Sequence, residues 1–211
     1  MALIVRSGAT TDEWTIDPTS KAGRVTPYDE AGRVVAPQSK RTYFVTNTFT
    51  PPATPTDMVT IFGAAGKIIT VVSFRITTTN TAAGSQQWFL IKRSGTNTGG
   101  TFVAGTSVPA RATDGAGNAT VGHYTANPSA LGAAVGNVNI KRYASPVAVP
   151  ATFAGIVQDA GHDMLQHMPN SLLDKPITLE AATEGLCLNF NGAALVAGQT
   201  HAYQIVYTEE P

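Results

Sequence analysis

Alternating apolar and polar residues recur along most of this chain. Segments with a two-residue period lie at 68–78, 186–190 and 203–207. This period is typical of β-strands that bury one face of a sheet and expose the other. The residues expected to face a core are Val72, Phe74, Ile76, Leu186, Leu188, Phe190, Tyr203, Ile205 and Tyr207.

One strand candidate, residues 86–93, lacks this alternation. Its apolar residues Trp88, Phe89, Leu90 and Ile91 are continuous. A continuous run is typical of a strand that is covered on both faces. We therefore predict a central strand whose outer face lies in a contact between subunits.

Shorter apolar segments between turn-rich clusters predict the remaining strands. Turn residues gather at 97–100, 114–118 and 191–192. About ten strands without strand–helix alternation favour an all-β fold, an antiparallel β-sandwich of jelly-roll-like form over residues 43–211. The shorter strands are predicted at 44–49, 58–62, 101–105, 119–124, 138–143, 151–157 and 177–181.

Two connections between strands carry local signals of their own. Residues 63–67, Gly-Ala-Ala-Gly-Lys, resemble a phosphate-binding loop but lack its first glycine and its Ser/Thr, so a hairpin turn is predicted instead. Residues 127–135 predict one short helix, because Asn127 can cap its start and Pro128 suits the first helical position.

The first 42 residues differ from the rest and are interpreted as an N-terminal arm. The tetrapeptide Ala-Gly-Arg-Val occurs at 22–25 and again at 31–34, with turn-forming residues between. This repeat predicts a small hairpin of residues 24–26 against 33–35. Two strands alone are marginal in water, so the arm must lie on its own body or on a neighbouring chain. The arm residues expected to bind a partner are Trp14, Ile16, Val25, Tyr28, Val34 and Val35.

The charge balance excludes attraction to polyanions as the basis of binding. Lys and Arg number 14, Asp and Glu also number 14, and the formal net charge is zero. Such a chain has no long-range field toward nucleic acid or an anionic membrane, so neither is expected as a direct partner. A hydrophobic content of 43% argues against disorder. We find no signal-peptide pattern and no apolar stretch of the ~20 residues that a membrane span needs.

Candidate chemistry is sparse. The single cysteine, Cys187, excludes an intrachain disulfide and a cysteine-based zinc cage. His162, Asp163 and His167 belong to a cluster at 159–167, but the two histidines are five residues apart and would not share a helix face. We interpret the cluster as a solvated loop, with a metal or polar site as the alternative. No nucleophile elbow is present, so no catalytic residue, metal or cofactor is predicted.

Longer segments resemble a family of virion structural proteins of tailed bacteriophages. The similar segments are 54–61, 80–93, 123–128 and 186–201, within a resemblance that spans about residues 43–208. The resemblance implies a β-rich virion component that is not an enzyme. It carries over no catalytic residues.

Three functions are open, the first two from this resemblance and the third from the polar cluster at 159–167. The first is a capsid decoration or cement protein, a homo-oligomer and most simply a trimer, which binds the major capsid protein and uses the arm as a fastener. It would be made in the host bacterial cytoplasm and located in the virion. The second is a neck, tail or fibre component involved in host attachment. The third is a carbohydrate-active or metal enzyme of jelly-roll form.

Overall fold

A computed structural model describes residues 40–145, 162–166 and 176–210, together with the backbone of four short strands. These strands are β1 (Val5–Arg6), β2 (Glu13–Ile16), β3 (Gly23–Val25) and β12 (Val157–Gln158). The chain divides into two compact units, Met1–Lys40 and Arg41–Pro211.

The first unit contains a three-stranded antiparallel sheet in the order β1-β2-β3. Trp14 of β2 pairs with Val5 on one side and with Val25 on the other. Part of the predicted hairpin lies in β3, which pairs here with β2. The predicted partner segment 33–35 lies outside the described residues.

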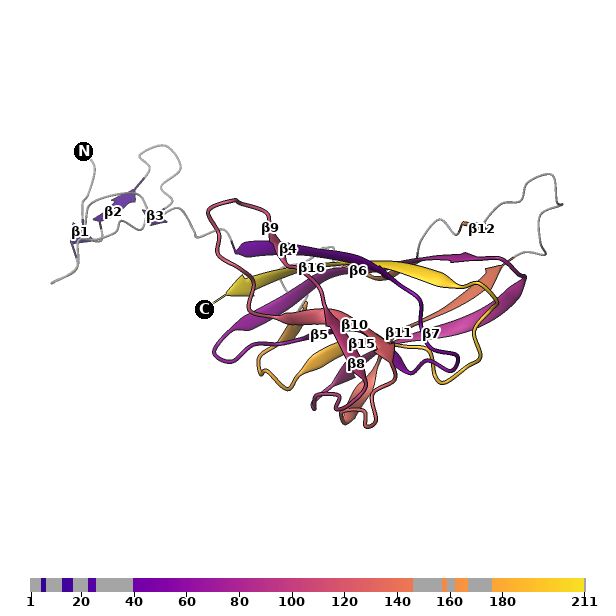
Figure 1. Ribbon diagram of the computed structural model, residues 1–211. Helices are drawn as coiled ribbons and strands as arrows, with labels where there is room; N and C mark the ends of the chain where they lie inside the picture. Colours follow the sequence, from indigo (N-terminus) through magenta and orange to yellow (C-terminus); the bar gives the residue numbers. More distant parts are fainter. Residues whose placement is uncertain are drawn as a thin grey trace. The chain divides into compact units, whose positions relative to one another are not determined.

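The second unit consists of two antiparallel sheets packed face to face (Figure 1). The six-stranded sheet has the order β11-β7-β15-β5-β10-β8, and the seven-stranded sheet has the order β12-β6-β16-β4-β9 with β13 and β14 also on β6. The strands are β4 (Arg41–Phe49), β5 (Asp57–Phe62), β6 (Ile68–Asn80), β7 (Gly84–Arg93), β8 (Thr101–Ala104), β9 (Val108–Pro109), β10 (Thr120–Ala126), β11 (Ala134–Ser145), β13 (His162–Gln166), β14 (Ile177–Leu179), β15 (Gly185–Asn189) and β16 (Thr200–Glu210).

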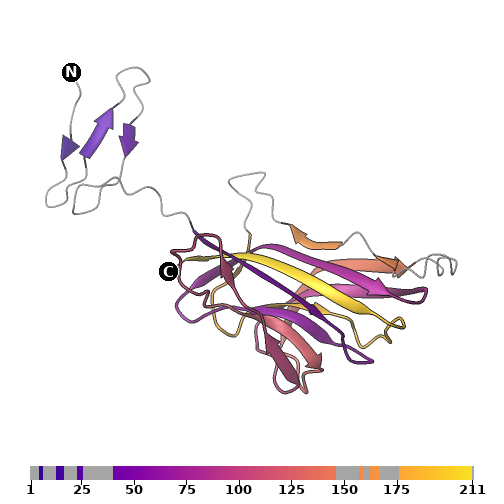
Figure 2. The same cartoon turned by 45° about the horizontal axis from the view of Figure 1, so that its top comes forward.

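The first strands of this unit, β4 to β7, alternate between the two sheets in the manner of a jelly roll. β4 and β6 belong to the seven-stranded sheet, whereas β5 and β7 belong to the six-stranded sheet. β16 lies between β4 and β6 (yellow in Figure 2), and β15 lies between β5 and β7. The late strands therefore fill the gaps left by the early ones, as in two linked Greek keys. The predicted antiparallel β-sandwich is confirmed.

The core lies between the inner faces of the two sheets. Tyr203 and Ile205 of β16 face it, as their alternation predicts, and Leu186 and Leu188 of β15 face it from the other sheet. Trp88 is fully buried and stacks on Tyr143 with ring centroids 5.3 Å apart. Burial of these large side chains supplies the main driving force for folding.

A β-bulge changes the alternation within β6. Ser73 pairs with Val206 and Val71 pairs with Tyr207, so Val72 is an extra residue on its strand. Val71 is consequently buried and Val72 only half-buried. The prediction that Val72 faces the core is therefore wrong, whereas Phe74 is buried as predicted.

Two predicted connections differ from the structure. Residues 63–67 form a turn, but β5 and β6 belong to different sheets, so the turn is an arch between sheets and not a hairpin. Residues 127–135 form no helix, because the Asn127 side chain bonds the proline-rich segment that precedes β5. Its Oδ1 accepts from the Thr56 amide at 3.0 Å and its Nδ2 donates to the Thr54 carbonyl at 2.9 Å.

Every residue of β5 and β15 is buried. One face of these strands meets the seven-stranded sheet. Their outer face is covered by the loop after β7 and by the segment before β11, which bond one another at Thr98 and Ala130. Among the described residues there is no helix, and so none that could cross a membrane.

Candidate functional site

A buried charged cluster lies beneath these two loops, on the outer face of the six-stranded sheet. The Asp57 carboxylate accepts two hydrogen bonds from Arg93, at 2.5 Å from Nε and 2.8 Å from Nη2. It also accepts from Asn97 Nδ2 at 2.9 Å and from Asn189 Nδ2 at 2.6 Å. Each carboxylate oxygen thus receives two donors, which compensates the cost of burying the charge.

The same cluster fixes the covering loops. Arg93 Nη1 donates to the Gly132 carbonyl at 2.7 Å, and the Gly132 amide donates to Asn97 Oδ1 at 2.9 Å. Burial alone would lower the pKa of Arg93, but the hydrogen bonds and charge of Asp57 outweigh it and raise that pKa. Since Asp57 already accepts four hydrogen bonds, we interpret the cluster as a structural clamp rather than a reactive site.

The hydroxyl of Thr78 and the imidazole of His201 form the nearest approach to a nucleophile–base pair. Thr78 Oγ1 lies 2.7 Å from His201 Nδ1, and both residues are about 1% exposed. Burial lowers the pKa of His201 to about 3, so its imidazole is a weak base at neutral pH. His201 also packs against Phe49 and Phe190, at centroid distances of 5.3 Å and 5.0 Å. This arrangement serves core packing and is closed to substrates in solution.

Cys187 is a packing residue. Its side chain is fully buried on β15. Burial first, and then the charge of Asp57, raise the pKa of the thiol well above its ordinary value. A thiol that stays protonated and inaccessible is a poor nucleophile and metal ligand.

The interpretation of residues 159–167 as a solvated loop is wrong for 162–166, which form β13 on the edge of β6. His162 lies edge-on to Trp88 with centroids 5.3 Å apart, and Met164 is fully buried. Asp163 points to solvent, with its Oδ1 3.7 Å from Arg75 Nε. Asp159 and His167 lie outside the described residues, and within the described part of the chain no group of three potential ligands could hold a metal.

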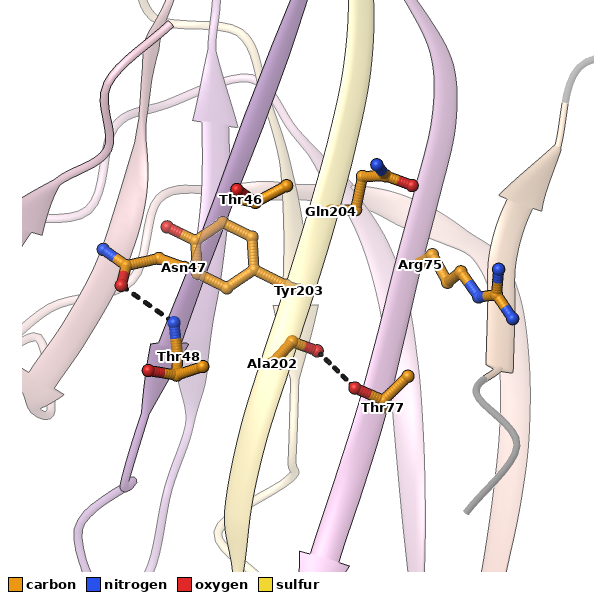
Figure 3. A pocket seen from close by; sticks show the side chains of 8 residues that line it. All are labelled: Thr46, Asn47, Thr48, Arg75, Thr77, Ala202, Tyr203 and Gln204. Atoms are coloured by element: carbon orange, nitrogen blue, oxygen red, sulfur yellow. Dashed lines mark hydrogen bonds between the residues drawn. The ribbon is translucent and has the colours of Figure 1, made fainter. Parts of the chain in front are cut away.

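A hollow of about 370 Å³ lies on the outer face of the seven-stranded sheet. Its floor is Ala202 of β16, which stands in register between Thr48 of β4 and Thr77 of β6. Figure 3 shows the short Ala202 side chain between these threonines, with Gln204 and Arg75 beside them. Most of the lining residues have polar side chains, but the surface that they present to the hollow is mainly apolar.

Half of the predicted partner-binding residues of the arm lie in described strands. Trp14 and Val25 are paired across β2 and β3, and Ile16 pairs with Gly23. Tyr28, Val34 and Val35 lie outside the described residues, so their joint role as a binding surface stays a prediction.

Four exposed apolar residues lie in β11 and just before it, and sequence reasoning missed them. They are Leu131, Val135, Val138 and Ile140, with exposed fractions of 39%, 64%, 38% and 47%. Three of them lie in β11, whose other edge pairs with no strand among the described residues. Phe89 of the neighbouring β7 is half-buried opposite Ile140. We call these four residues the β11 patch.

The sequence held only part of the signal for this patch. Residues 138–143 were predicted as a strand, and the outer face of Trp88–Ile91 was predicted to lie in a subunit contact. Their alternation does not show that β11 lies at an edge, because strand order depends on contacts distant in sequence. Two bulges, at Val135 and Val138, further obscure the alternation.

Comparisons with protein-family models, with curated proteins and with solved structures found no match to this chain.

Proposed function

We propose that this protein is a structural component of a tailed-bacteriophage virion, without enzymatic activity, that assembles through protein–protein contacts. The observation that carries the assembly role is the β11 patch, because exposed apolar side chains grouped at a sheet edge are typical of interaction sites. The virion assignment rests on the sequence resemblance described above.

Within the virion, the position we favour is the outside of the head. There the second unit would bind the major capsid protein and further copies of itself, most simply as a trimer, and the first unit would act as the fastener. Several weak contacts on one closed oligomer gain avidity that one contact lacks. A decoration protein therefore has to be present in many copies per particle.

Counting copies in purified virions tests this position. Heads and tails are separated, and the chain is quantified by mass spectrometry against the major capsid protein. We expect a fixed high ratio in the head fraction. A few copies in the tail fraction would overturn decoration in favour of a neck, tail or fibre role, and absence from virions would overturn the virion role itself.

Substitution of the patch tests the contact. Val138→Thr combined with Ile140→Thr keeps β-branched residues on β11 but removes apolar contact area. We expect this variant to remain folded and to bind particles that lack the protein at least tenfold more weakly. Val108→Thr, at an exposed valine on β9, is the matched control and should bind normally. Equal binding by all three proteins would show that the β11 patch is not the contact.

A further inference from the structure

A second hollow, of about 290 Å³, lies on the outer face of the six-stranded sheet. Phe62 of β5, Phe102 of β8 and Tyr124 of β10 line it, and Thr96 and Thr120 add hydroxyl groups. Phe62 alternates with the core residue Ile61, which places its ring on the face opposite the core. Aromatic rings from three strands therefore meet at the base of the hollow, where Phe62 and Tyr124 are buried and Phe102 is half-buried.

Two glycines make room for these rings. A Cβ on Gly122 would lie 2.6 Å from the Phe102 ring, and a Cβ on Gly185 would lie 2.4 Å from the Phe62 ring. Both rings thus lie close against the backbone of a neighbouring strand. Phe102 and Tyr124 contact each other with centroids 5.1 Å apart and planes inclined by 58°. These three rings, which we call the aromatic wall, are consequently held by strands of the sheet and not by a loop.

The loop after β7, which forms the side of the hollow next to the rings, is also held in place by hydrogen bonds. Asn97 lines the hollow, but its amide is committed to Asp57 through Nδ2 and to the Gly132 amide through Oδ1. Asn97 therefore positions the loop after β7. The buried cluster of Asp57 and Arg93 therefore fixes the shape of the hollow before a ligand binds. A fixed shape lowers the entropy cost of binding.

The polar groups left for a ligand are hydroxyls. Thr96 and Thr120 are exposed at the hollow. Thr60, two residues before Phe62 on the same face, is fully buried and does not line the hollow, so its hydroxyl is not among these groups.

We propose that this hollow binds one ring of a neutral carbohydrate. A sugar ring offers C–H groups to stack on Phe102, the least buried of the three rings, and hydroxyls to pair with Thr96 and Thr120. None of the residues lining the hollow is charged, which favours a neutral ligand. The volume lies at the small end of ligand sites, which fits one ring and not a chain of them. This binding is independent of the assembly role.

The test uses the full chain and NMR titration with glucose, galactose, mannose and N-acetylglucosamine as separate probes. We expect saturable shifts for at least one sugar, at the backbone amides of residues 96–102, 120 and 124, with a dissociation constant in the millimolar range. Phe102→Leu keeps an apolar side chain but removes the flat ring, and should weaken binding at least tenfold. Val103→Ala, at the next residue of β8, is the control and should bind normally.

Other outcomes overturn the proposal. Shifts confined to the hollow around Ala202, or no saturable shift with any sugar, would exclude sugar binding at this site. Saturable binding of indole in the absence of any sugar response would assign the hollow to apolar rings instead. Unchanged sugar binding by a folded Phe102→Leu protein would show that the aromatic wall is not the binding surface.

Discussion

At the scale of single residues, Asp57 and Arg93 show how charge is used inside this fold. Their side chains are 0% and 5% exposed, and all four hydrogen bonds to the carboxylate come from strands or loops distant in sequence. Asp57→Ala would leave the Arg93 guanidinium buried without its partner. We expect a loss of about 3–5 kcal/mol in the free energy of unfolding, measured by urea denaturation.

The exposed pair of Arg75 and Asp163 provides the control for this measurement. Their side chains are 47% and 52% exposed and lie 3.7 Å apart. Asp163→Ala should therefore change the free energy of unfolding by less than about 1 kcal/mol. Similar losses for Asp57→Ala and Asp163→Ala would show that the buried cluster does not act as a clamp.

His201 predicts a loss of stability in acid. Its pKa is 6.5 in the unfolded chain and about 3 in the folded protein, because burial disfavours the charged imidazole. Between pH 6.5 and pH 3, the His201 imidazole is therefore protonated in the unfolded state but stays neutral in the folded state. Stability from this group is complete above pH 6.5 and falls as the pH drops toward 3, by about 5 kcal/mol in all.

Urea denaturation between pH 7 and pH 4 measures this dependence. His201→Gln retains a hydrogen-bonding group beside Thr78 but cannot titrate, so its stability should fall less steeply with decreasing pH than that of the parent. Burial also lowers the pKa of His123, which adds a residual slope of the same sign. Parallel pH profiles for parent and variant would contradict the assignment to His201.

At the scale of elements, the pairing of β8 with β10 depends on Gly122. A Cβ at this position would lie 2.3 Å from the Val103 carbonyl oxygen, which is backbone and cannot move without displacing β8. We expect Gly122→Ala to cost about 1–3 kcal/mol, measured by thermal or urea unfolding. Gly136→Ala in β11 would meet nothing within 4 Å and should be close to neutral. A neutral Gly122→Ala would show that β8 is free to shift.

At the scale of the whole molecule, the chain divides at Lys40 into two compact units. The core of the second unit is formed by its own sheets, so removal of residues 1–40 should leave a soluble protein that melts cooperatively, as followed by circular dichroism. The truncated protein should bind particles or its own copies more weakly than the full chain, because the proposed fastener is gone. Aggregation or loss of the cooperative transition would show that the first unit contributes to the core.

The sequence by itself determined most of the described strands and most of their inward faces, although β9 and β13 were not predicted and residues 151–156 lie outside the described part of the chain. Alternation at 203–207 identified Tyr203, Ile205 and Tyr207 as core residues, and all three are buried. The glycine and asparagine turn at 191–192 was predicted too, and both residues have positive φ, at 58° and 66°. These features are local, because side-chain direction in a strand and turn geometry depend on residues near in sequence.

Only the tertiary structure decided what covers each strand. Cys187 and Asn189 alternate with the core residues Leu186 and Leu188, and they are buried all the same; the Asn189 side chain bonds Asp57 beneath the covering loops. The position of β11 at the end of its sheet and both hollows likewise depend on strand order and on which loops cross a sheet. Those contacts join residues far apart in the chain. The alternation of side chains along one strand does not show which strands or loops lie beside it.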